Sequence, residues 1–500
     1  MAQVTIFGGA GSIGGNKIHI REGSYGLLLD FGIDFSIYSR FYGDFLTPRS
    51  GRGIYDYLHL GLLPPIANYR QDLTPADLTL NGMPEIPIDA LLLSHAHMDH
   101  VGLAGMLDTA IPLVASGTTL GLIKAMQDSG PARMGSDCIY TKERIPHDER
   151  TLISGRKEAI GRDLIVTDAM TDSFSSLIST IPQGKGATIT ASVSALDESK
   201  IPFSIDACPV DHSIPGATGF LLGGDLSIAY TGDIRTHGRE NTGTSRFVDA
   251  ARAMGTLIIE GTRLSREEEP SYSEVSEEEV AWNCRAVVAE ENGLVIADFS
   301  PRNIERLAIF QEIAERCGRQ LVVTAKDAYL LQAMAACGHL NLLPSLMMHG
   351  GFSDPRMAGW KKGLSEHISP VSSEEVKRDP GGYILCFSLY DLVALPDIDP
   401  EGGTYIYSTC EAFNEEMALD AARLHQWLDR FGIRCHGLPG RSPGSSGFHA
   451  SGHASPGDLE AIVDRIDPDL IIPVHTTAPE WFSKRWEQVV IPETGEAIIC

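Results

Sequence analysis

The sequence predicts an α/β chain with more than one domain, and three observations lead to that expectation. The chain has 500 residues, more than one hydrophobic core usually contains. Its first 33 residues form strand-like runs joined by glycine-rich turns. Residues 265–400 instead alternate strand-like runs, such as "GLVIADFS", "QLVVTA" and "GGYILCFS", with helical runs such as "NIERLAIFQEIAERCG". That alternation indicates a second α/β domain.

The glycine-rich turn near the N-terminus raises the question of nucleotide binding. Gly9, Gly11 and Gly14 follow an apolar run with the spacing G-x-G-x-x-G, and Asp30 ends the run "GLLLD". A dinucleotide-binding unit needs a helix between the third glycine and the acidic residue. Only 16 positions separate Gly14 from Asp30, and "KIHIR" between them alternates with the period of a strand. We therefore predict a β-meander at this point and no dinucleotide site.

Composition and charge exclude several classes of protein. No apolar run approaches the roughly 20 residues of a membrane helix, and the N-terminus lacks the features of a signal peptide. The nine cysteines include no C-x-x-C pair, which indicates reduced thiols and predicts a cytoplasmic protein. The net charge of −26 argues against strong nucleic-acid binding over the general surface. A polyanion would have to be held by a local patch or by metal ions.

The strongest chemical signal follows the buried-strand run "IPIDALLLS" at residues 86–94. His95, His97, Asp99 and His100 place four side chains of ligand type on a strand-to-helix turn. Imidazole and carboxylate together suit zinc or a similar divalent ion. In an extended segment His95 and His97 point to the same side, so they can bind one metal, while Asp99 and His100 can face a second. A chance histidine-rich loop is the alternative, but four such residues within six positions argue against it.

This stretch resembles the H-x-H-x-D-H signature of the metallo-β-lactamase superfamily, whose fold is an αββα sandwich. The resemblance implies further site residues, which occur in family order at strand ends. Asp30 matches the residue that supports the metal loop from behind. His212 matches the third motif, and Asp233 matches the carboxylate that bridges two metals. His475, after "LIIPV", matches the last ligand.

The distance between the last two motifs points to one branch of that superfamily. His475 lies 242 positions after Asp233, far more than small hydrolases of this fold need. An inserted α/β domain resembles the β-CASP nucleases, which include RNase J. The expected division is residues 1–262 and 403–500 for the metallo-β-lactamase domain, and 263–402 for the β-CASP insertion.

Two later motifs are also similar to RNase J. Glu260 matches the acidic motif A, and "FHASGHASPGDL" resembles an H-x-S-G-H stretch with His453 at motif B and His449 and Ser451 beside it. The resemblance implies that His453 contacts the scissile phosphate and that Glu260 orients it. Directly after this stretch, Ser455 is expected to cap a helix.

Two segments have alternative interpretations. Ser300 and Asn303, in "IADFSPRNIERL", match RNase J residues that help to hold a terminal phosphate, but a helix N-cap explains them equally well. Residues 34–85 form a longer connection than RNase J usually has, rich in Tyr, Arg and Pro. They either line the substrate cleft or cover an edge of the sheet, and we favour the covering role.

The resemblance implies a two-metal mechanism with zinc, or alternatively manganese. The expected ligands of the first Zn²⁺ are His95, His97 and His212, and those of the second are Asp99, His100 and His475. Asp233 and a hydroxide would lie between the two ions. The hydroxide attacks phosphorus, Asp99 steers its proton, and His453, oriented by Glu260, protonates the leaving group.

The expected function is hydrolysis of single-stranded RNA by a zinc-dependent nuclease. DNA is one alternative substrate. A small ester or phosphodiester is another, and the acidic composition favours it. An inactive scaffold in a nucleic-acid-processing complex is a third reading, and the complete set of ligand positions argues against it. Internal or 5′-terminal cleavage, and assembly as a homodimer, stay open.

Overall fold

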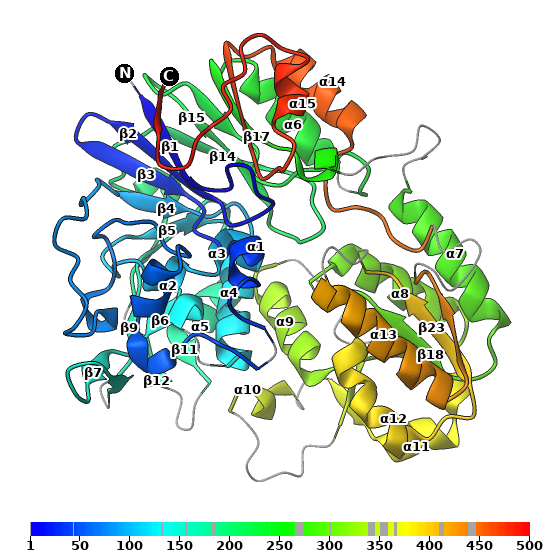
Figure 1. The fold of residues 1–500 in the computed structure, drawn as a ribbon. Coiled ribbons are helices and arrows are strands. Elements are labelled where there is room, and N and C mark those ends of the chain that lie inside the picture. The colour runs from blue at the N-terminus through cyan, green and yellow to red at the C-terminus, as the bar shows by residue number, and fades with distance from the viewer. Residues whose placement is uncertain are drawn as a thin grey trace. The chain divides into compact units, whose positions relative to one another are not determined.

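The computed structural model describes residues 2–500 except positions 44, 132–133, 156–157, 183–186, 190, 240, 266–274, 301, 339–345, 351–358, 365–367, 410–414 and 439–446. The chain forms two compact units, coloured along the chain in Figure 1. The first contains Met1–Thr236, Glu240–Glu269 and His453–Cys500. The second contains His237–Arg239 and Pro270–Gly452.

The larger sheet of the first unit has eight strands in the order β13-β10-β5-β4-β3-β2-β1-β26. The strands are β1 (Gln3–Gly8), β2 (Lys17–Glu22), β3 (Tyr25–Leu29), β4 (Ala90–Leu92), β5 (Leu113–Ala115), β10 (Leu164–Val166), β13 (Val193–Ala195) and β26 (Ala497–Ile499). β1, β2 and β3 are consecutive antiparallel neighbours, which confirms the predicted β-meander. From β3 to β13 the pairing is parallel.

The second sheet has five strands, in the order β14-β15-β16-β17-β25. They are β14 (Ile205–Pro209), β15 (Thr218–Leu222), β16 (Ile228–Tyr230), β17 (Thr256–Glu260) and β25 (Leu470–Val474). Ile258 and Ile472 on its inner face share one core with Leu29 and Leu92 of the larger sheet. Because side chains alternate along a strand, Leu257 and its neighbours point outward, where they pack with α6 (Thr242–Ala251) and α14 (Pro456–Ile466).

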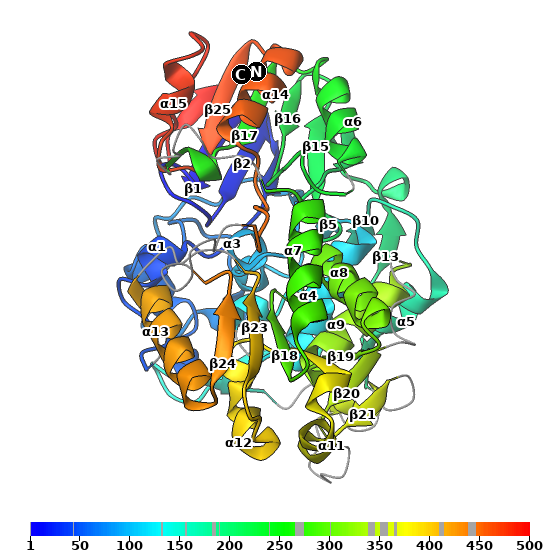
Figure 2. The ribbon, with the colours of Figure 1, turned by 90° about the vertical axis from the view of Figure 1, so that its right-hand side faces the viewer.

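Helices also accompany the larger sheet. α4 (Gly117–Ser129) begins directly after β5 and buries Leu120 and Leu122, and Figures 1 and 2 show it beside that strand. The first unit is thus a two-sheet sandwich with helices outside, and the αββα fold class is confirmed. Its other elements are α1 (Phe35–Tyr38), α2 (Tyr55–His59), α3 (Met98–Val101), α5 (Asp172–Ser179), α15 (Glu480–Ser483), β6 (Tyr140–Thr141), β7 (Arg144–Pro146), β8 (Leu152–Ser154), β9 (Ile160–Gly161), β11 (Thr180–Ile181) and β12 (Ala187–Thr188).

The long connection at residues 34–85 packs against the rest of the first unit. Ile54, Leu63 and Leu73 are buried, and Tyr69 forms an isolated bridge with Leu107. The segment thus packs onto the first unit, and its role as the cover of a sheet edge stays a prediction.

The second unit is built on a parallel sheet of seven strands, in the order β21-β20-β19-β22-β18-β23-β24. The strands are β18 (Val295–Asp298), β19 (Gln320–Val323), β20 (Leu346–His349), β21 (Ser369–Val371), β22 (Tyr383–Cys386), β23 (Gly403–Tyr407) and β24 (Ile433–His436). The helices are α7 (Glu277–Glu290), α8 (Ile304–Arg316), α9 (Ala325–Ala336), α10 (Gly359–Lys362), α11 (Ser373–Arg378), α12 (Leu395–Ile398) and α13 (Glu415–Arg430). None of the helices in the described part of the chain is long and apolar enough to cross a membrane.

The end of the second unit differs from the boundary placed at residue 402. β23 pairs with β18 on one side and with β24 on the other, so the second unit continues to Gly452. The sequence after Gly403 has an ordinary strand pattern, and such a pattern does not reveal which sheet a strand joins. Hydrogen bonding to distant strands decides that membership.

Candidate metal centre

The turn after β4 carries four of the predicted site residues. His97 is the N-cap of α3, with φ −78° and ψ 148°, so the chain is extended up to His97 and helical from Met98. The extended part directs His95 and His97 to one side. The first helical turn then carries Asp99 and His100. The strand-to-helix change therefore separates the four side chains into two pairs.

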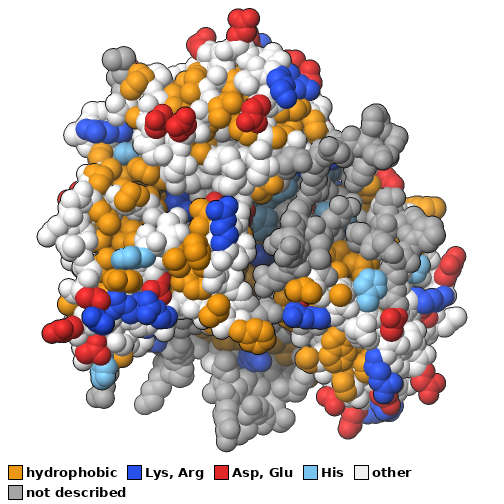
Figure 3. All heavy atoms as spheres, in the orientation of Figure 1, with side chains coloured by type: hydrophobic (Ala, Val, Ile, Leu, Met, Phe, Trp, Pro, Cys, Tyr) orange, Lys and Arg blue, Asp and Glu red, His pale blue; other side chains and the backbone are white. Residues whose placement is uncertain are grey.

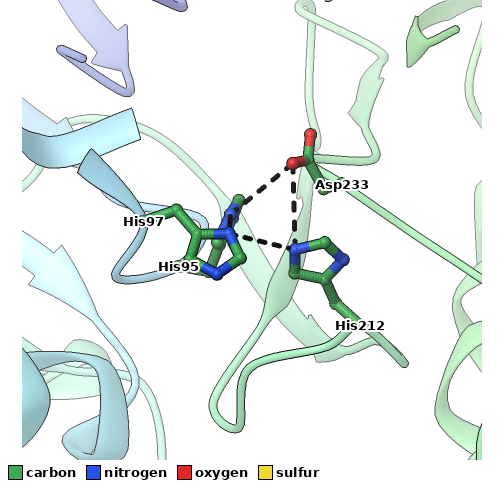
Figure 4. Close-up of side chains that lie close together, drawn as sticks. All are labelled: His95, His97, His212 and Asp233. Atoms are coloured by element: carbon green, nitrogen blue, oxygen red, sulfur yellow. Dashed lines mark hydrogen bonds and ion pairs between the residues drawn. The ribbon is translucent and has the colours of Figure 1, made fainter. Parts of the chain in front are cut away.

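The first group consists of His95, His97, His212 and Asp233 (Figure 4). Nε2 of His95 lies 3.0 Å from Nδ1 of His97, and Nε2 of His212 lies 3.2 Å from that same Nδ1. Oδ2 of Asp233 lies 3.6 Å from Nε2 of His95 and 3.8 Å from Nε2 of His212. Two imidazoles from the turn after β4 and one from the loop after β14 thus converge on one carboxylate.

The second group consists of Asp99, His100 and His475. Nε2 of His475 lies 3.3 Å from Oδ2 of Asp99, and Nε2 of His100 lies 3.9 Å from the same oxygen. Asp233 also faces this group, because Oδ2 is 3.2 Å from Nε2 of His100 and Oδ1 is 3.8 Å from Nε2 of His475. Asp233 therefore lies between both groups, where the predicted bridging carboxylate would have to lie.

Asp30 fixes the ring of His100. Oδ2 of Asp30 lies 2.8 Å from Nδ1 of His100 and also accepts from the hydroxyls of Ser94 and Tyr230. The carboxylate can only accept, so Nδ1 of His100 carries the proton and Nε2 turns its lone pair toward Asp233. Ser94 donates to Asp30, so its oxygen accepts from Nδ1 of His95, 3.0 Å away. Both imidazoles are thereby set in the tautomer that a metal ligand needs.

Thr262 fixes the tautomer of His475. Its hydroxyl lies 2.6 Å from Oε2 of Glu260 and 2.8 Å from Nδ1 of His475. Since Thr262 donates its one proton to Glu260, its oxygen accepts from Nδ1 of His475. Nε2 of His475 is then the unprotonated nitrogen, and it faces Asp99 and Asp233.

A third group combines Asp233, Glu260 and His453. Nδ1 of His453 lies 3.0 and 3.1 Å from the two oxygens of Glu260 and 3.9 Å from Oδ2 of Asp233. Glu260 is buried, and it also accepts from the backbone N–H groups of Ile234 and Thr262. Its acceptor positions are thus used by protein donors, which favours a role in orienting His453 over binding an ion.

The glycine turn that imitates a dinucleotide motif supports the metal loop. A Cβ on Gly14 would lie 2.7 Å from Cβ of Asp99, and the N–H of Gly15 donates to the carbonyl of Asp99. The carbonyl of Gly9 accepts from the N–H of His475, whose φ is +54°. The turn therefore contacts both Asp99 and His475 of the second group. A side chain at Gly14 would collide with the side chain of Asp99.

Burial and close charges shift the pKa values of the site in opposite directions. Burial opposes ionisation of Asp233, yet His100 and His475 lower its pKa well below the usual range. Burial and the neighbouring histidines lower the pKa of His95, so its imidazole is neutral. Burial alone would favour neutral His453, but Glu260 and Asp233 raise the pKa of that ring. Burial opposes a charge on His100, but Asp233, Asp30 and Asp99 raise the pKa of its ring well above the usual range, so a divalent ion bound there would displace a proton.

The donor set fits divalent metal ions. Oδ1 of Asp233 and Nε2 of His100 are buried and have no hydrogen-bond partner among the described residues. Such orphaned acceptors cost free energy unless a cation satisfies them. Imidazole with carboxylate is the ligand chemistry of zinc and related ions.

The remaining predicted residues lie in the second unit. Asn303 is the N-cap of α8, where its side chain accepts from the N–H of Arg306 at 2.9 Å, and Ser300 O accepts from the N–H of Asn303. The N-cap alternative therefore accounts for Asn303. His449 and Ser451 are half-buried, and the carbonyl of Ser451 lies 2.8 Å from Nε2 of His237.

Sequence reasoning missed the residues that orient the ligands. Ser94, Thr262 and Tyr230 are common hydroxyl residues in strand-end positions. The sequence offers one indication for two of them, which is their closeness to site residues. Ser94 directly precedes His95, and Thr262 follows Glu260 by two positions. Adjacency alone does not reveal which imidazole a hydroxyl will contact.

Comparisons with known proteins agree with this geometry. Residues 62–119 match the model of the metallo-β-lactamase superfamily. Ribonuclease J of Methanocaldococcus jannaschii is 21% identical over 494 residues, covering 95% of this chain and 91% of the relative. Ribonuclease J of Sinorhizobium meliloti is 22% identical over 302 residues, covering 55% of this chain and 46% of that one. A crystal structure of a protein of unknown function from Enterococcus faecalis V583 superposes with a TM-score of 0.69 at 23% identity, over 100% of both chains, and shares the fold.

Proposed function

The chain is a metallo-β-lactamase superfamily protein similar to ribonuclease J, and we propose that it is a zinc-dependent nuclease of the β-CASP type that hydrolyses single-stranded RNA. In this proposal residues 263–402, with the strands that the second unit adds up to Gly452, form the β-CASP domain. The ligands are those of the two groups around Asp233. Mn²⁺ is the alternative metal.

The observation that carries the proposal is the position of His453. Its Nδ1 donates to both oxygens of buried Glu260, and it lies 3.9 Å from the carboxylate shared by the two ligand groups. An imidazole held in this way, next to a metal centre but oriented by a carboxylate, suits a general acid. A hydrolase acting on a substrate with a good leaving group has little need of one.

Two divalent ions, when bound, lower the pKa of a nearby water and neutralise charge on phosphoryl oxygens. The residues of the chain orient the general acid and transfer the protons. Glu260 holds the His453 ring and, through its charge, keeps a proton on it. His453 delivers that proton from Nε2 to the leaving oxygen of the ribose. Asp99 accepts the proton released by the attacking water.

The choice of RNA rests on the relatives and on one stretch of sequence. Both curated relatives are named ribonuclease J. His449 and Ser451 precede His453 in the order of the RNase J stretch, and in the proposal they contact the substrate phosphate together with it. Ser300 and Asn303 are the proposed contacts to a terminal phosphate, and Asn303 would then serve as helix cap and phosphate ligand at once. The proposal places the enzyme in the cytoplasm.

A metallo-hydrolase of DNA or of a small ester or phosphodiester is the second candidate. The net charge of −26 favours it, because a strongly acidic protein repels a long polyanion. A small substrate would interact with the metal centre alone.

One experiment separates the candidates. Zinc-loaded protein is incubated with end-labelled single-stranded RNA, single-stranded DNA of the same sequence, and bis(p-nitrophenyl) phosphate. The proposal expects RNA to be cut fastest and the Asp233→Asn variant to cut none of the three. Hydrolysis of the small diester with no cleavage of RNA would favour the second candidate. The length of the labelled product distinguishes internal from 5′-terminal cleavage.

A further inference from the structure

The second unit contains a groove between α7 and α8 that takes no part in the metal centre. The two helices contact each other, and Figures 1 and 2 both show them side by side. Its lining repeats one pattern on each helix, at positions i, i+3, i+4 and i+7. The residues are Glu278, Ala281, Trp282 and Arg285 on α7, and Ile309, Glu312, Ile313 and Arg316 on α8, with Arg239 beside them.

Two arginines of the groove make no ion pair with its glutamates. Glu278 and Glu312 both pair with Arg239, at 3.6 and 3.4 Å. Arg285 and Arg316 make no ion pair within the described part of the chain. On a chain of net charge −26 this is a local excess of guanidinium groups. Guanidinium is the group that binds phosphate in a bidentate manner.

An exposed tryptophan lies between these charges. Trp282 is 63% exposed, although Ile309 and Ile313 in the same groove are buried. A large aromatic side chain left in water costs free energy, so an exposed one next to arginines suggests a ligand that covers it. Single-stranded nucleic acids are bound in this way, by bases stacked on aromatic rings and by cationic groups on the backbone.

The groove is smaller than the enclosed pockets that usually hold drug-sized molecules. Its volume is about 250 Å³, below the roughly 300–1,000 Å³ of enclosed small-molecule pockets. Basic and acidic side chains are interspersed on the face that Figure 3 shows. Elsewhere in the chain arginines pair with carboxylates, as in Arg49–Asp56 and Arg52–Asp77. The α7–α8 groove is therefore a place where phosphate can be held against the general repulsion of the surface.

We propose that the α7–α8 groove is an accessory binding site for single-stranded RNA, in which Trp282 stacks on a base and Arg285 and Arg316 bind phosphates. The site rests on the proposed function, since it holds a part of the same substrate outside the metal centre. It supplies affinity for long RNA and takes no part in bond cleavage.

The test measures binding and cleavage separately. Binding of a fluorescein-labelled 20-nucleotide RNA is followed by anisotropy in the presence of EDTA, at several salt concentrations. Trp282→Ala is expected to weaken binding about 5- to 150-fold, the range that one stacked base provides. Arg285→Ala combined with Arg316→Ala should make the slope of log K against log salt shallower by about 1.4, or about 0.7 for each lost phosphate.

Control variants distinguish the loss of stacking at Trp282 from a general effect of removing an exposed aromatic side chain. Trp282→Phe retains stacking and should bind within a few-fold of the wild type, and Tyr390→Ala, which removes another exposed aromatic of the same unit (74% exposed), should bind as the wild type does. All groove variants should hydrolyse bis(p-nitrophenyl) phosphate at the wild-type rate. Unchanged RNA affinity and salt slope in both groove variants would overturn the site, even if the enzyme cleaves RNA. RNA binding that depends on the groove, without any cleavage, would overturn the proposed nuclease instead. If the groove binds a protein rather than RNA, the groove variants should likewise show unchanged RNA affinity and salt slope, and the proposed site would be wrong.

Discussion

The hydroxyl of Thr262 lies 2.8 Å from Nδ1 of His475 and 2.6 Å from Oε2 of Glu260. One side chain thus links a candidate metal ligand to the carboxylate that orients His453. Its single proton sets the direction of both hydrogen bonds. The candidate metal centre and the candidate general acid are therefore aligned by the same residue.

Replacing Thr262 by valine should weaken metal binding while leaving the ligands intact. Valine keeps the shape of threonine but offers no acceptor to Nδ1 of His475, so the correct tautomer is no longer enforced. Loss of such an outer contact typically costs about 10–100-fold in metal affinity. Competition with a chromophoric zinc chelator measures it. Thr262→Ser keeps the hydroxyl and should bind as the wild type does; equal affinity in the valine variant would contradict this role.

The ligand groups around Asp233 predict about two zinc or manganese ions per chain. Elemental analysis of dialysed protein measures the content. His97→Ala and Asp233→Asn should each lose at least one ion, because each removes a donor atom from a converging set. Chelation should abolish hydrolysis, and added zinc should restore it. Full activity in protein shown to be metal-free would refute the two-metal assignment.

His453→Ala should keep both metals and the fold but lose roughly 10²–10⁴-fold in RNA cleavage, the usual contribution of a general acid. Hydrolysis of bis(p-nitrophenyl) phosphate should fall far less, because its leaving group needs little protonation. Glu260→Gln should show a milder form of the same pattern. Since the two residues act through one hydrogen-bonded pair, their combined effect should be much less than additive.

Two outcomes would contradict that role for His453. If His453→Ala loses an ion by elemental analysis, the third group of Asp233, Glu260 and His453 is a metal site. If RNA cleavage survives at the wild-type rate, the residue is not needed and the β-CASP nuclease proposal fails.

Gly14→Ala should disrupt the second ligand group. The new Cβ would lie 2.7 Å from Cβ of Asp99, at a φ of +79°. Gly11→Ala is the matched control, because Gly11 also has a positive φ, +64°, but has no atom within 4 Å of the added Cβ. The control should lose only the roughly 1–2 kcal/mol of left-handed strain. Gly14→Ala should lose more stability in urea unfolding, and also metal content; equal behaviour of both variants would exclude the contact with Asp99 as the reason for glycine here.

The second unit should lose stability as pH rises from near 3.8 to about 7, with little further loss above that. Burial raises the pKa of Asp298 to about 7, and Asp391 adds to this, although the Tyr405 hydroxyl 2.5 Å away works against it. Between the ordinary pKa near 3.8 and about 7 the folded state binds more protons than the unfolded one, so the free energy of unfolding falls as pH increases. Asp298→Asn removes this dependence. Urea unfolding at pH 5, 6, 7 and 8 measures the effect. The free energy of unfolding of the variant, relative to that of the wild type, should rise by up to about 1.4 kcal/mol for each pH unit.

A contrary result for Asp298 is equally clear. If the difference in stability between wild type and Asp298→Asn is the same at pH 5 and pH 8, the carboxyl titrates at the same pH in both states. Its burial against Tyr405 would then be compensated by other groups.

Features carried by neighbouring residues could be predicted from the sequence. The period of "KIHIR" is local, and it gave the β-meander in place of a dinucleotide unit. The box of Ser455 and Asp458 that begins α14 is also local, because a cap and its partner lie within one turn. The spacing of His95, His97, Asp99 and His100 specifies metal chemistry for the same reason, since a strand that becomes a helix fixes where those side chains point.

Features that depend on distant contacts were decided only by the tertiary structure. The membership of β23 in the second unit follows from its pairing with β18 and β24, which no local pattern encodes. The sequence left two readings of Asn303 open, and its contact with the N–H of Arg306 identifies it as the cap of α8. Gly14 and Asp99 meet across 85 positions, and Thr262 and His475 across 213. The sequence by itself thus determined which chemical groups the site contains, and folding determined their partners, because hydrogen bonds and close packing act between atoms near in space whatever their separation along the chain.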